Sequence, residues 1–357
     1  MSPHGFGHAA RSCAVMSELR RQSPATDFHI FTDVPSWFFS ESLPDCFSHH
    51  PFATDVGLAQ LSPLVEDLEA TADLLDQKPV DDPVSVARLA TEIKKRGCSV
   101  VVVDISPLGL AAAAEVGIPS ILIENFTWDW IYLNYPESPP RLRHHGRGMV
   151  EIFASADFRI QTNPVCQLRP GSVAVGPVAR NPRTGREEIR VSLGIPVDEA
   201  MIVVSMGGVP WDYREFSGFV HADGPWIVVP GGSEGRARRE GRLLLLPFHA
   251  EVYHPDLVAA SDLVVSKLGY STVAEAYRAG SALLYVGRPR FPESPVLARW
   301  VEEKMVAAEI EESALRGGGW LAAANELLEV PRRKPDAENG AVQAAEVILK
   351  RFPFLGE

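Results

Sequence analysis

The amino-acid sequence predicts an α/β protein built from two doubly wound domains. Short apolar runs rich in Val, Ile and Leu alternate with helix-like stretches, which is typical of parallel strands joined by crossover helices. The alternation is interrupted once, by a glycine and two prolines in the segment 175–183, and then starts again. A chain of 357 residues also exceeds what one hydrophobic core usually organises, so two domains of ordinary size are expected.

The first domain is predicted to span residues 1–175. Its strand-like runs lie at 27–32, 99–105, 119–124 and 158–161. The clearest unit covers 99–124, where an apolar run ends in an aspartate and an Ala-rich stretch follows over 108–116. The turn 117–119 then leads into another apolar run, and this order is that of a βαβ unit.

The second domain is predicted to span residues 176–335. Five apolar runs, at 201–205, 226–229, 243–246, 263–266 and 282–286, have the length and composition of buried parallel strands. The remaining segment, 336–357, is predicted to contain a helix over 337–351 with alanines and aliphatic residues on its apolar positions. Packing back onto the N-terminal domain is one arrangement open to this helix.

The charge pattern limits the classes of partner. A net charge of -12 favours solubility and provides no basic surface for duplex nucleic acid, so no nucleic-acid partner is expected. One basic run, 141–147, is interpreted as a solvated loop, with contact to an anionic acceptor or a lipid headgroup as the alternative. No apolar run reaches bilayer length and the N-terminus lacks an apolar signal core, so membrane contact is expected to be peripheral at most.

The four cysteines predict neither a zinc site nor a disulfide framework. Cys13, Cys46, Cys98 and Cys166 are widely spaced, form no CxxC pair and have no ligand set near them in the sequence. A reducing cytoplasmic location fits this usage.

The opening segment 4–11, HGFGHAAR, contains two glycines and two histidines just before a predicted helix. Gly5 and Gly7 let the backbone approach a ligand closely, and the start of a helix favours an anion. His8 is suited to act as a general base on an acceptor hydroxyl, because the unperturbed pKa of histidine is near working pH. A tight turn with packed or capping histidines is the structural alternative.

The position of this turn leads to an expectation about the chain start. A Gly-rich turn of this kind normally follows a strand, yet only Met1, Ser2 and Pro3 precede it. In a doubly wound sheet the missing strand would be central, and its absence would leave an unpaired edge on both neighbours. We therefore expect the natural chain to begin upstream of Met1.

A second ligand-binding candidate is the segment 266–275, SKLGYSTVAE, which joins a strand to a helix through a glycine turn. Ser271 or Thr272 could cap the helix, whose first amides would then face a diphosphate near Lys267 and Gly269. Glu275, one turn further along, is placed to accept hydrogen bonds from ribose hydroxyls. An ordinary capped helix with a solvated glutamate remains the alternative.

Other residues follow predicted strands and are candidates for the same ligand. Gly207 and Gly208 follow the run 201–205 and could admit a diphosphate or simply form a turn. Glu293 lies beyond the run 282–286, where its carboxylate could bind sugar hydroxyls or be an exposed loop carboxylate. His249 and His254 flank another strand end and are interpreted as structural or loop histidines.

The segment 125–132, NFTWDWIY, places aromatic residues around a carboxylate just after a predicted strand. Asn125, Trp128 and Asp129 could form a wall for an acceptor or sugar, with ring faces for apolar patches and oxygens for hydroxyls. Core packing is an equal alternative for two of the three aromatic residues.

The segments 4–11, 55–58 (DVGL), 103–107 (VDISP), 125–132 and 266–275, taken in this order, resemble the GT-B glycosyltransferases. The resemblance is to the family that contains the lipid-linked UDP-N-acetylglucosamine transferase of peptidoglycan synthesis. It is closer still to the glycosyltransferase-like N-terminal region of plant L-arabinokinases and to stand-alone bacterial relatives. It implies the GT-B fold, in which two Rossmann-like domains face each other across a cleft.

The same resemblance implies a function. The chain is expected to move a hexosyl group from a nucleotide diphosphate sugar, here a UDP-sugar, to an unidentified acceptor. The C-terminal domain would hold the donor, His8 matches the family's loop histidine near the acceptor, and Glu275 matches its ribose-binding acid. Inverting transfer without a cofactor is expected, and the lack of a DxD-like acidic pair in a convincing loop favours independence of metal ions. A non-catalytic nucleotide-sugar-binding protein and a nucleotide-sugar epimerase are the alternatives, because one fold hosts several functions.

Overall fold

The computed structural model describes residues 1–43, 47–207, 223–248 and 251–355. The chain divides into two compact units. Unit 1 contains Met1–Val178, Arg290–Val296 and Glu338–Glu357, and unit 2 contains Ala179–Pro289 and Leu297–Ala337. Unit 1 is therefore assembled from three separate stretches of sequence.

Unit 1 is built on parallel strands. β5 (Val101–Asp104), β6 (Ser120–Glu124), β7 (Phe158–Thr162) and β8 (Val173–Val175) form a four-stranded sheet in that order. β1 (Phe28–Phe31) and β2 (Phe47–His50) form a separate parallel pair, and β3 (Ala59–Ser62) and β4 (Val65–Asp67) form an antiparallel hairpin. The predicted βαβ unit is confirmed by β5, α5 (Pro107–Val116) and β6.

The first two residues connect the two parallel parts of unit 1. The amino group of Met1 donates to the Phe31 carbonyl at 3.2 Å, and the Ser2 amide donates to the Asp104 carbonyl at 3.1 Å. Within the described ranges, β1 pairs only with β2 and β5 pairs only with β6. Met1 and Ser2 thus lie between the carboxyl ends of β1 and β5.

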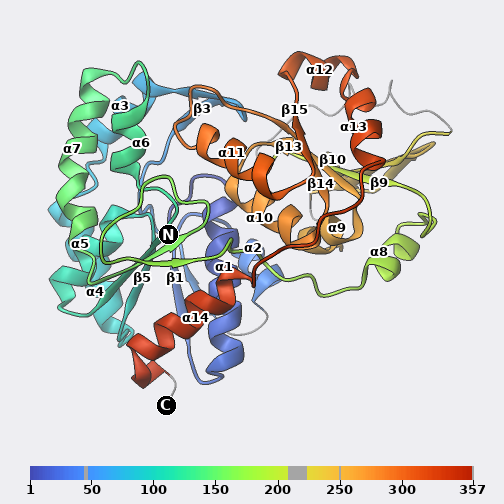
Figure 1. Ribbon diagram of the computed structural model, residues 1–357. Helices are drawn as coiled ribbons and strands as arrows, with labels where there is room; N and C mark the ends of the chain where they lie inside the picture. The colour runs from blue at the N-terminus through green and yellow to red at the C-terminus, as the bar shows by residue number, and fades with distance from the viewer. Residues whose placement is uncertain (44–46, 208–222, 249–250, 356–357) are drawn as a thin grey trace. The chain divides into compact units, whose positions relative to one another are not determined.

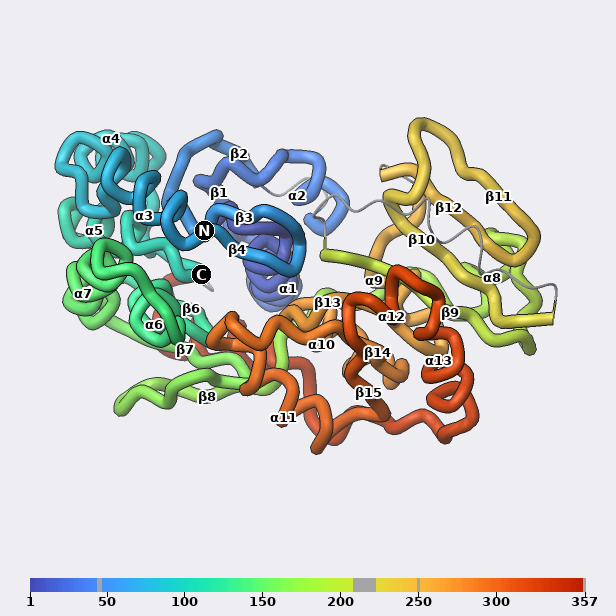
Figure 2. The backbone as a smooth tube through the Cα atoms, turned by 90° about the horizontal axis from the view of Figure 1, so that it is seen from above, coloured from blue at the N-terminus to red at the C-terminus, as the bar shows by residue number. Residues whose placement is uncertain are grey.

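Helices cover the strands of unit 1 and contribute its core. α4 (Pro83–Lys95) lies beside α5, and α6 (Trp128–Asn134) lies beside α7 (Pro140–Ala154), as Figure 2 shows. α14 (Gly340–Arg351) packs beside α1 (Gly7–Gln22) near the bottom of Figure 1. The buried side chains of Ala344, Ala345 and Ile348 join those of α1 and β6 in one hydrophobic cluster. The smaller helices of unit 1 are α2 (Ser36–Ser42) and α3 (Leu68–Gln77).

Unit 2 contains a seven-stranded sheet in the order β11-β12-β10-β9-β13-β14-β15. Its strands are β9 (Met201–Ser205), β10 (Trp226–Ser233), β11 (Arg238–Glu240), β12 (Leu243–Pro247), β13 (Leu263–Lys267), β14 (Ala282–Val286) and β15 (Ala307–Glu309). Every neighbouring pair is parallel except β11 with β12. The chain runs outward from β9 through β10 to β12 and then returns to the other side of β9, which is the doubly wound order.

The sequence predicted the main strands of unit 2 because they are fully buried. Met201–Ser205 and Ala282–Val286 were predicted with these bounds, and both are apolar and buried along their whole length. The short strands β2, β3, β4, β8, β11 and β15 were missed, since three or four residues give no clear periodicity. The helices of this part are α8 (Arg186–Ser192), α9 (His254–Ala260), α10 (Tyr270–Ala279), α12 (Glu312–Gly317) and α13 (Trp320–Leu328). α11 (Ser294–Lys304) begins in the unit 1 stretch Arg290–Val296 and continues into unit 2. Within the described ranges, no helix has the length and apolar character needed to cross a bilayer.

Candidate functional site

The structure places His8 against a carboxylate at the end of a strand. α1 begins at Gly7, so His8 lies in its first turn rather than ahead of the helix as predicted. Its Nδ1 atom lies 2.8 Å from Oδ1 of Asp104, the last residue of β5. Both side chains are largely buried, and the His8 ring packs edge-on against Phe126 with centroids 5.8 Å apart. Asp104 therefore orients the imidazole and favours the tautomer with its proton on Nδ1.

Arg11 neutralises this carboxylate. It lies one turn after His8 on the same face of α1, and its guanidinium donates to Asp104 through Nε at 2.8 Å and Nη2 at 2.7 Å. Burial alone would raise the pKa of Asp104, but Arg11 and His8 outweigh it and hold that pKa well below its ordinary value. Asp104 is therefore ionised throughout the physiological range.

Arg11 also links the dyad to two other predicted site residues. Its Nη1 donates to the Asn125 side-chain oxygen at 2.6 Å, and Asn125 Nδ2 donates to Glu293 at 2.6 Å. Asn125 and Glu293 are only 1% and 3% exposed. We predicted Glu293 as a donor-binding residue of the C-terminal domain, but residues 290–296 belong to unit 1. Glu293 thus extends a buried polar network that begins at His8.

The aromatic segment does not form the exposed wall that the sequence suggested. Trp128 is 1% exposed, begins α6 and stacks on Tyr132 with centroids 5.6 Å apart. Asp129 is 3% exposed; Arg169 lies 3.7 Å from one of its oxygens, and the other has no hydrogen-bond partner among the described residues. The rings face inward because residues 128–134 are helical, which places Trp128 and Tyr132 on the same face. Trp128 is thus a buried packing residue whose ring lies against that of His8.

The glycines of the opening turn differ in backbone conformation. Gly5 has a φ of +65°, and a Cβ placed there would meet nothing within 4 Å. A side chain would have room at Gly5 but would be strained by this backbone conformation. Gly7 is the first residue of α1, whose start has no side-chain cap.

In unit 2 the predicted ligand residues gather where the strand order reverses. β9 and β13 are neighbours, and ligands of doubly wound sheets bind at the carboxyl ends of such strands. Gly207 follows β9 with a φ of +69°, and a Cβ there would lie 3.4 Å from Cε of Lys267, the last residue of β13. Gly208 lies outside the described residues. Gly207 and Lys267 therefore lie together at the carboxyl ends of β9 and β13.

A chain of four side chains lies next to this edge. Ser205 Oγ is 3.1 Å from His254 Nε2, and His254 Nδ1 is 3.2 Å from one oxygen of Glu275. The other oxygen of Glu275 accepts from Arg180 Nε at 2.8 Å. Burial opposes ionisation, but Arg180 and His254 lower the pKa of Glu275 to about 2. Glu275 is thus a fixed, ionised carboxylate and not the solvated glutamate of the alternative interpretation.

The start of α10 differs from the prediction. Gly269 is the N-cap residue, no side chain caps the helix, and Ser271 and Thr272 lie within its first turn. Neither residue is the cap that we predicted, because the helix begins at Tyr270. Glycine is an acceptable N-cap and leaves the approach to the first turn unobstructed by a side chain.

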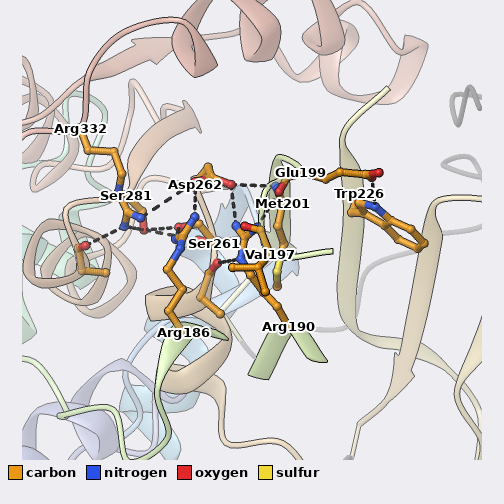
Figure 3. Close-up of polar contacts among 12 residues, drawn as sticks. Arg186, Arg190, Val197, Glu199, Met201, Trp226, Ser261, Asp262, Ser281 and Arg332 are labelled. Carbon is orange, nitrogen blue, oxygen red and sulfur yellow. Dashed lines mark hydrogen bonds and ion pairs between the residues drawn. The ribbon is translucent and has the colours of Figure 1, made fainter. Parts of the chain in front are cut away.

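A second polar cluster, drawn in Figure 3, lies at the amino-terminal end of β13 in the unit 2 sheet. Asp262, just before β13, accepts from Arg186, from Arg190 at 2.6 Å and from the Met201 amide at 2.8 Å. Arg332 reaches the same place and donates to the last carbonyls of α10. A cavity of about 280 Å³ adjoins this cluster, but three carboxylates, from Asp198, Glu199 and Asp262, line it together with the three arginines. Balanced charge and donors committed to backbone carbonyls indicate a structural role.

The basic run 141–147 is helical, which corrects the predicted loop. It lies in α7, where Arg141 pairs with Asp73 and His145 pairs with Asp76, both on α3. The described cysteines, Cys13, Cys98 and Cys166, are free thiols, and Cys46 lies outside the described residues. Within the described ranges, no group of three or more His, Cys, Asp or Glu side chains could hold a metal ion.

Sequence reasoning missed several members of these clusters. Asp104, Arg11, Arg180 and Ser205 were not singled out, and His254 was interpreted as a structural or loop residue. Two signals were present: Arg11 follows His8 at helical spacing, and Asp104 and Ser205 end apolar strands. Arg180 had no signal, because it lies 95 positions from Glu275 in a segment without regular structure.

No family model matches the chain. It is 27% identical to the L-arabinokinase of Arabidopsis thaliana over 355 residues, which cover 97% of this chain and 33% of that relative. The chain thus spans about a third of the length of this relative. An uncharacterized glycosyltransferase of Methanopyrus kandleri is 23% identical over 87% of this chain and 93% of its own. An N-acetylglucosamine transferase of Desulforudis audaxviator, named as acting on pyrophosphoryl-undecaprenol, is 30% identical over 42% of this chain and 45% of its own.

Solved structures agree on the fold. UGT89C1 of Arabidopsis thaliana, in complex with UDP, superimposes with a TM-score of 0.61 at 12% identity over 98% of this chain and 97% of that one. A UDP-glucosyltransferase from Polygonum tinctorium gives a TM-score of 0.58 at 15% identity, over 97% of this chain and 96% of that one. The predicted GT-B fold is confirmed, and by sequence and fold the chain is similar to GT-B glycosyltransferases.

Proposed function

We propose that this GT-B chain transfers a hexosyl group from a UDP-sugar to an acceptor hydroxyl, with inversion at the anomeric carbon and without a metal ion. The observation that carries the proposal is the His8–Asp104 contact of 2.8 Å beside the paired Arg11. With a proton on Nδ1, the imidazole presents Nε2 as its basic nitrogen. A general base held in this way is what transfer to a hydroxyl requires.

The chemical step conserves atoms and charge. The acceptor oxygen loses its proton to Nε2 of His8 and forms a bond to the anomeric carbon. The bond from that carbon to the diphosphate breaks on the opposite face, and the diphosphate leaves with the electron pair. The imidazolium, stabilised by Asp104, then returns its proton to solvent.

Unit 2 supplies the donor-binding groups in this proposal. Lys267 and the start of α10 offset the charge of the diphosphate, and Gly207 admits it close to the backbone. Glu275 accepts from the ribose hydroxyls, since each carboxylate oxygen can accept more than the one hydrogen bond it makes to the protein. A UDP donor is further supported by the relative with UDP bound and by the transferase named for a UDP-sugar.

The proposal is tested by donor binding and turnover measured on the same variants. Calorimetry with UDP-, GDP- and dTDP-sugars identifies the donor, and a transfer assay with an acceptor panel measures turnover. His8→Ala should lower kcat by about 10²- to 10⁴-fold and leave the Kd of the donor nearly unchanged. His144→Ala, on the exposed face of α7, is the matched control.

The outcomes separate the candidate functions. Retained turnover in His8→Ala would refute the assignment of the base. Donor binding without transfer to any acceptor would identify a nucleotide-sugar-binding protein. Release of a free 2-epimer without an acceptor would identify an epimerase. Loss of turnover on adding a chelator would refute metal independence.

A further inference from the structure

Asp55 lies in a segment that the structure holds rigidly beside His8. The carbonyl of Thr54 accepts from Ser106 Oγ at 2.7 Å, and the carbonyl of Gly57 accepts from the Tyr132 hydroxyl at 2.6 Å. The Leu58 amide donates to Nδ1 of His4 at 3.3 Å. The backbone on both sides of Asp55 is therefore fixed, as expected for a residue that must present its side chain in one position.

The carboxylate of Asp55 uses only part of its hydrogen-bonding capacity. Ser2 Oγ donates to one oxygen at 2.9 Å, and the indole nitrogen of Trp128 donates to the other at 3.3 Å. Two carboxylate oxygens can accept about four hydrogen bonds. The Trp128 ring also packs against the His8 ring at 6.2 Å, so the acid and the base border the same indole. Asp55 retains some exposed surface, unlike Asp104.

The surroundings of Asp55 offset its negative charge only in part. No lysine or arginine in the described part of the chain forms an ion pair with it. Burial raises the pKa of Asp55 to about 6, partly offset by Ser2, the Met1 amino group, His8 and Trp128. The Tyr132 hydroxyl is a further titratable group that interacts with Asp55, and His4 packs against the Trp128 ring that contacts it. An amide of the same shape could accept from Trp128 and donate to Ser2, so the fold needs the shape but not the charge.

We propose that Asp55 is an acceptor-binding residue that accepts a hydrogen bond from a second hydroxyl of a polyhydroxylated acceptor. This rests on the proposed function, in which His8 deprotonates one acceptor hydroxyl. A carboxylate that forms no ion pair with a lysine or arginine, at the end of parallel strands, can bind a neutral polyol through a charge-assisted hydrogen bond. The acceptor is therefore a carbohydrate or sugar alcohol, and a simple mono-alcohol lacks the group that Asp55 recognises.

The first experiment measures kinetics of Asp55→Asn with monosaccharides, alditols and mono-alcohols as acceptors. The variant should raise the KM of the polyol acceptors on the order of 10- to 100-fold, the effect of losing a hydrogen bond to a charged group. Its kcat should change by less than about threefold and the donor Kd not at all, because His8 is unaltered. Asp73→Asn, at the α3–α7 surface pair, is the matched control.

The second experiment measures stability, which a merely structural role would move in the opposite direction. Because the folded protein holds the Asp55 proton to higher pH than the unfolded chain, this carboxyl destabilises the fold more as pH rises through about 6. Asp55→Asn should therefore have a Tm equal to or above wild type at pH 7.5. The difference should shrink toward pH 5 while Asp73→Asn tracks wild type.

Three results would overturn the inference: a lower Tm of Asp55→Asn at pH 7.5, a fall in kcat with unchanged KM, or equal use of mono-alcohols and polyols. Binding of the same polyols, followed by saturation-transfer NMR on wild type and Asp55→Asn, needs no turnover. If polyols bind in an Asp55-dependent way but no sugar is transferred, the proposed function fails and this inference stands. If transfer occurs without dependence on Asp55, only the inference fails.

Discussion

Nδ1 of His8 lies 2.8 Å from Oδ1 of Asp104, and the same carboxylate holds the guanidinium of Arg11 through two contacts. The ion pair with Arg11 holds the Asp104 carboxylate in place, and this carboxylate orients the His8 ring. With its proton on Nδ1, His8 has Nε2 as its one basic nitrogen. Asp104 thus sets the protonation pattern of the residue that we propose as the general base.

Asp104→Asn should lower kcat by about 10²- to 10⁴-fold, because the amide can no longer hold a proton on Nδ1 or stabilise the imidazolium. The KM of the donor should stay within about twofold. Steady-state kinetics with a saturating acceptor checks this prediction. Since the substitution also leaves Arg11 without its carboxylate, a circular dichroism spectrum must show that the variant is folded. A folded variant with wild-type kcat would contradict the role of Asp104.

Glu275→Gln should destabilise unit 2 by about 3–5 kcal/mol, because Arg180, 8% exposed, would lose its counter-charge. In the wild type the pKa of Glu275 is about 2, below its ordinary value of 4.5. Its ionised form therefore stabilises the fold above pH 4.5, and this contribution is lost as the pH falls toward 2. Urea unfolding at several pH values should show the wild type losing this advantage in acid while Glu275→Gln does not. Parallel pH profiles would argue against the ion pair.

Asp262→Asn should unfold unit 2 at lower denaturant concentration without a direct effect on the donor Kd. Arg190 is fully buried and Arg186 is partly buried, so removing their shared carboxylate is expected to cost about 3–5 kcal/mol. Asp198→Asn, on the same cavity wall, is the control and should stay within about 0.5 kcal/mol of wild type. An increased donor affinity in Asp262→Asn would show that the cluster influences binding.

Ile348→Ala should destabilise unit 1 by about 2–5 kcal/mol, because Ile348 is fully buried where α14 packs against α1. Hydrogen exchange followed by mass spectrometry should locate the increase in exchange in α1 and α14. Val347→Ala, a neighbouring and less buried position, should have a smaller effect. Increased exchange confined to unit 2 would be inconsistent with this packing.

Much of the fold could be predicted because the central strands are continuous apolar runs. β9 and β14 are buried on both faces, so their sequences are uniformly hydrophobic and their bounds are sharp. The site was only partly predictable because its contacts join distant positions. His8 and Asp104 are 96 positions apart, and Asn125 and Glu293 are 168 apart. A single sequence carries no signal for such pairs.

The aromatic segment shows how the backbone conformation decides where a side chain lies. Tryptophan is a residue type typical of sugar-binding surfaces, but Trp128 begins a helix and its side chain lies in the core. Its indole nitrogen is instead what contacts Asp55. The sequence predicted a ligand-binding wall at this segment, whereas the structure buries Trp128 and leaves its indole nitrogen bonded to Asp55.

The three-part composition of unit 1 has a consequence for how a ribosome delivers this protein. Residues 1–178 emerge first, yet the helical partner of α1 comes from 340–351, after all of unit 2 has been made. The apolar face of α1 that packs against α14 therefore stays exposed while about 160 further residues are synthesised. At 5 to 20 residues per second this takes on the order of ten to thirty seconds. Binding of a chaperone to nascent chains should peak in this interval and end once α14 leaves the exit tunnel.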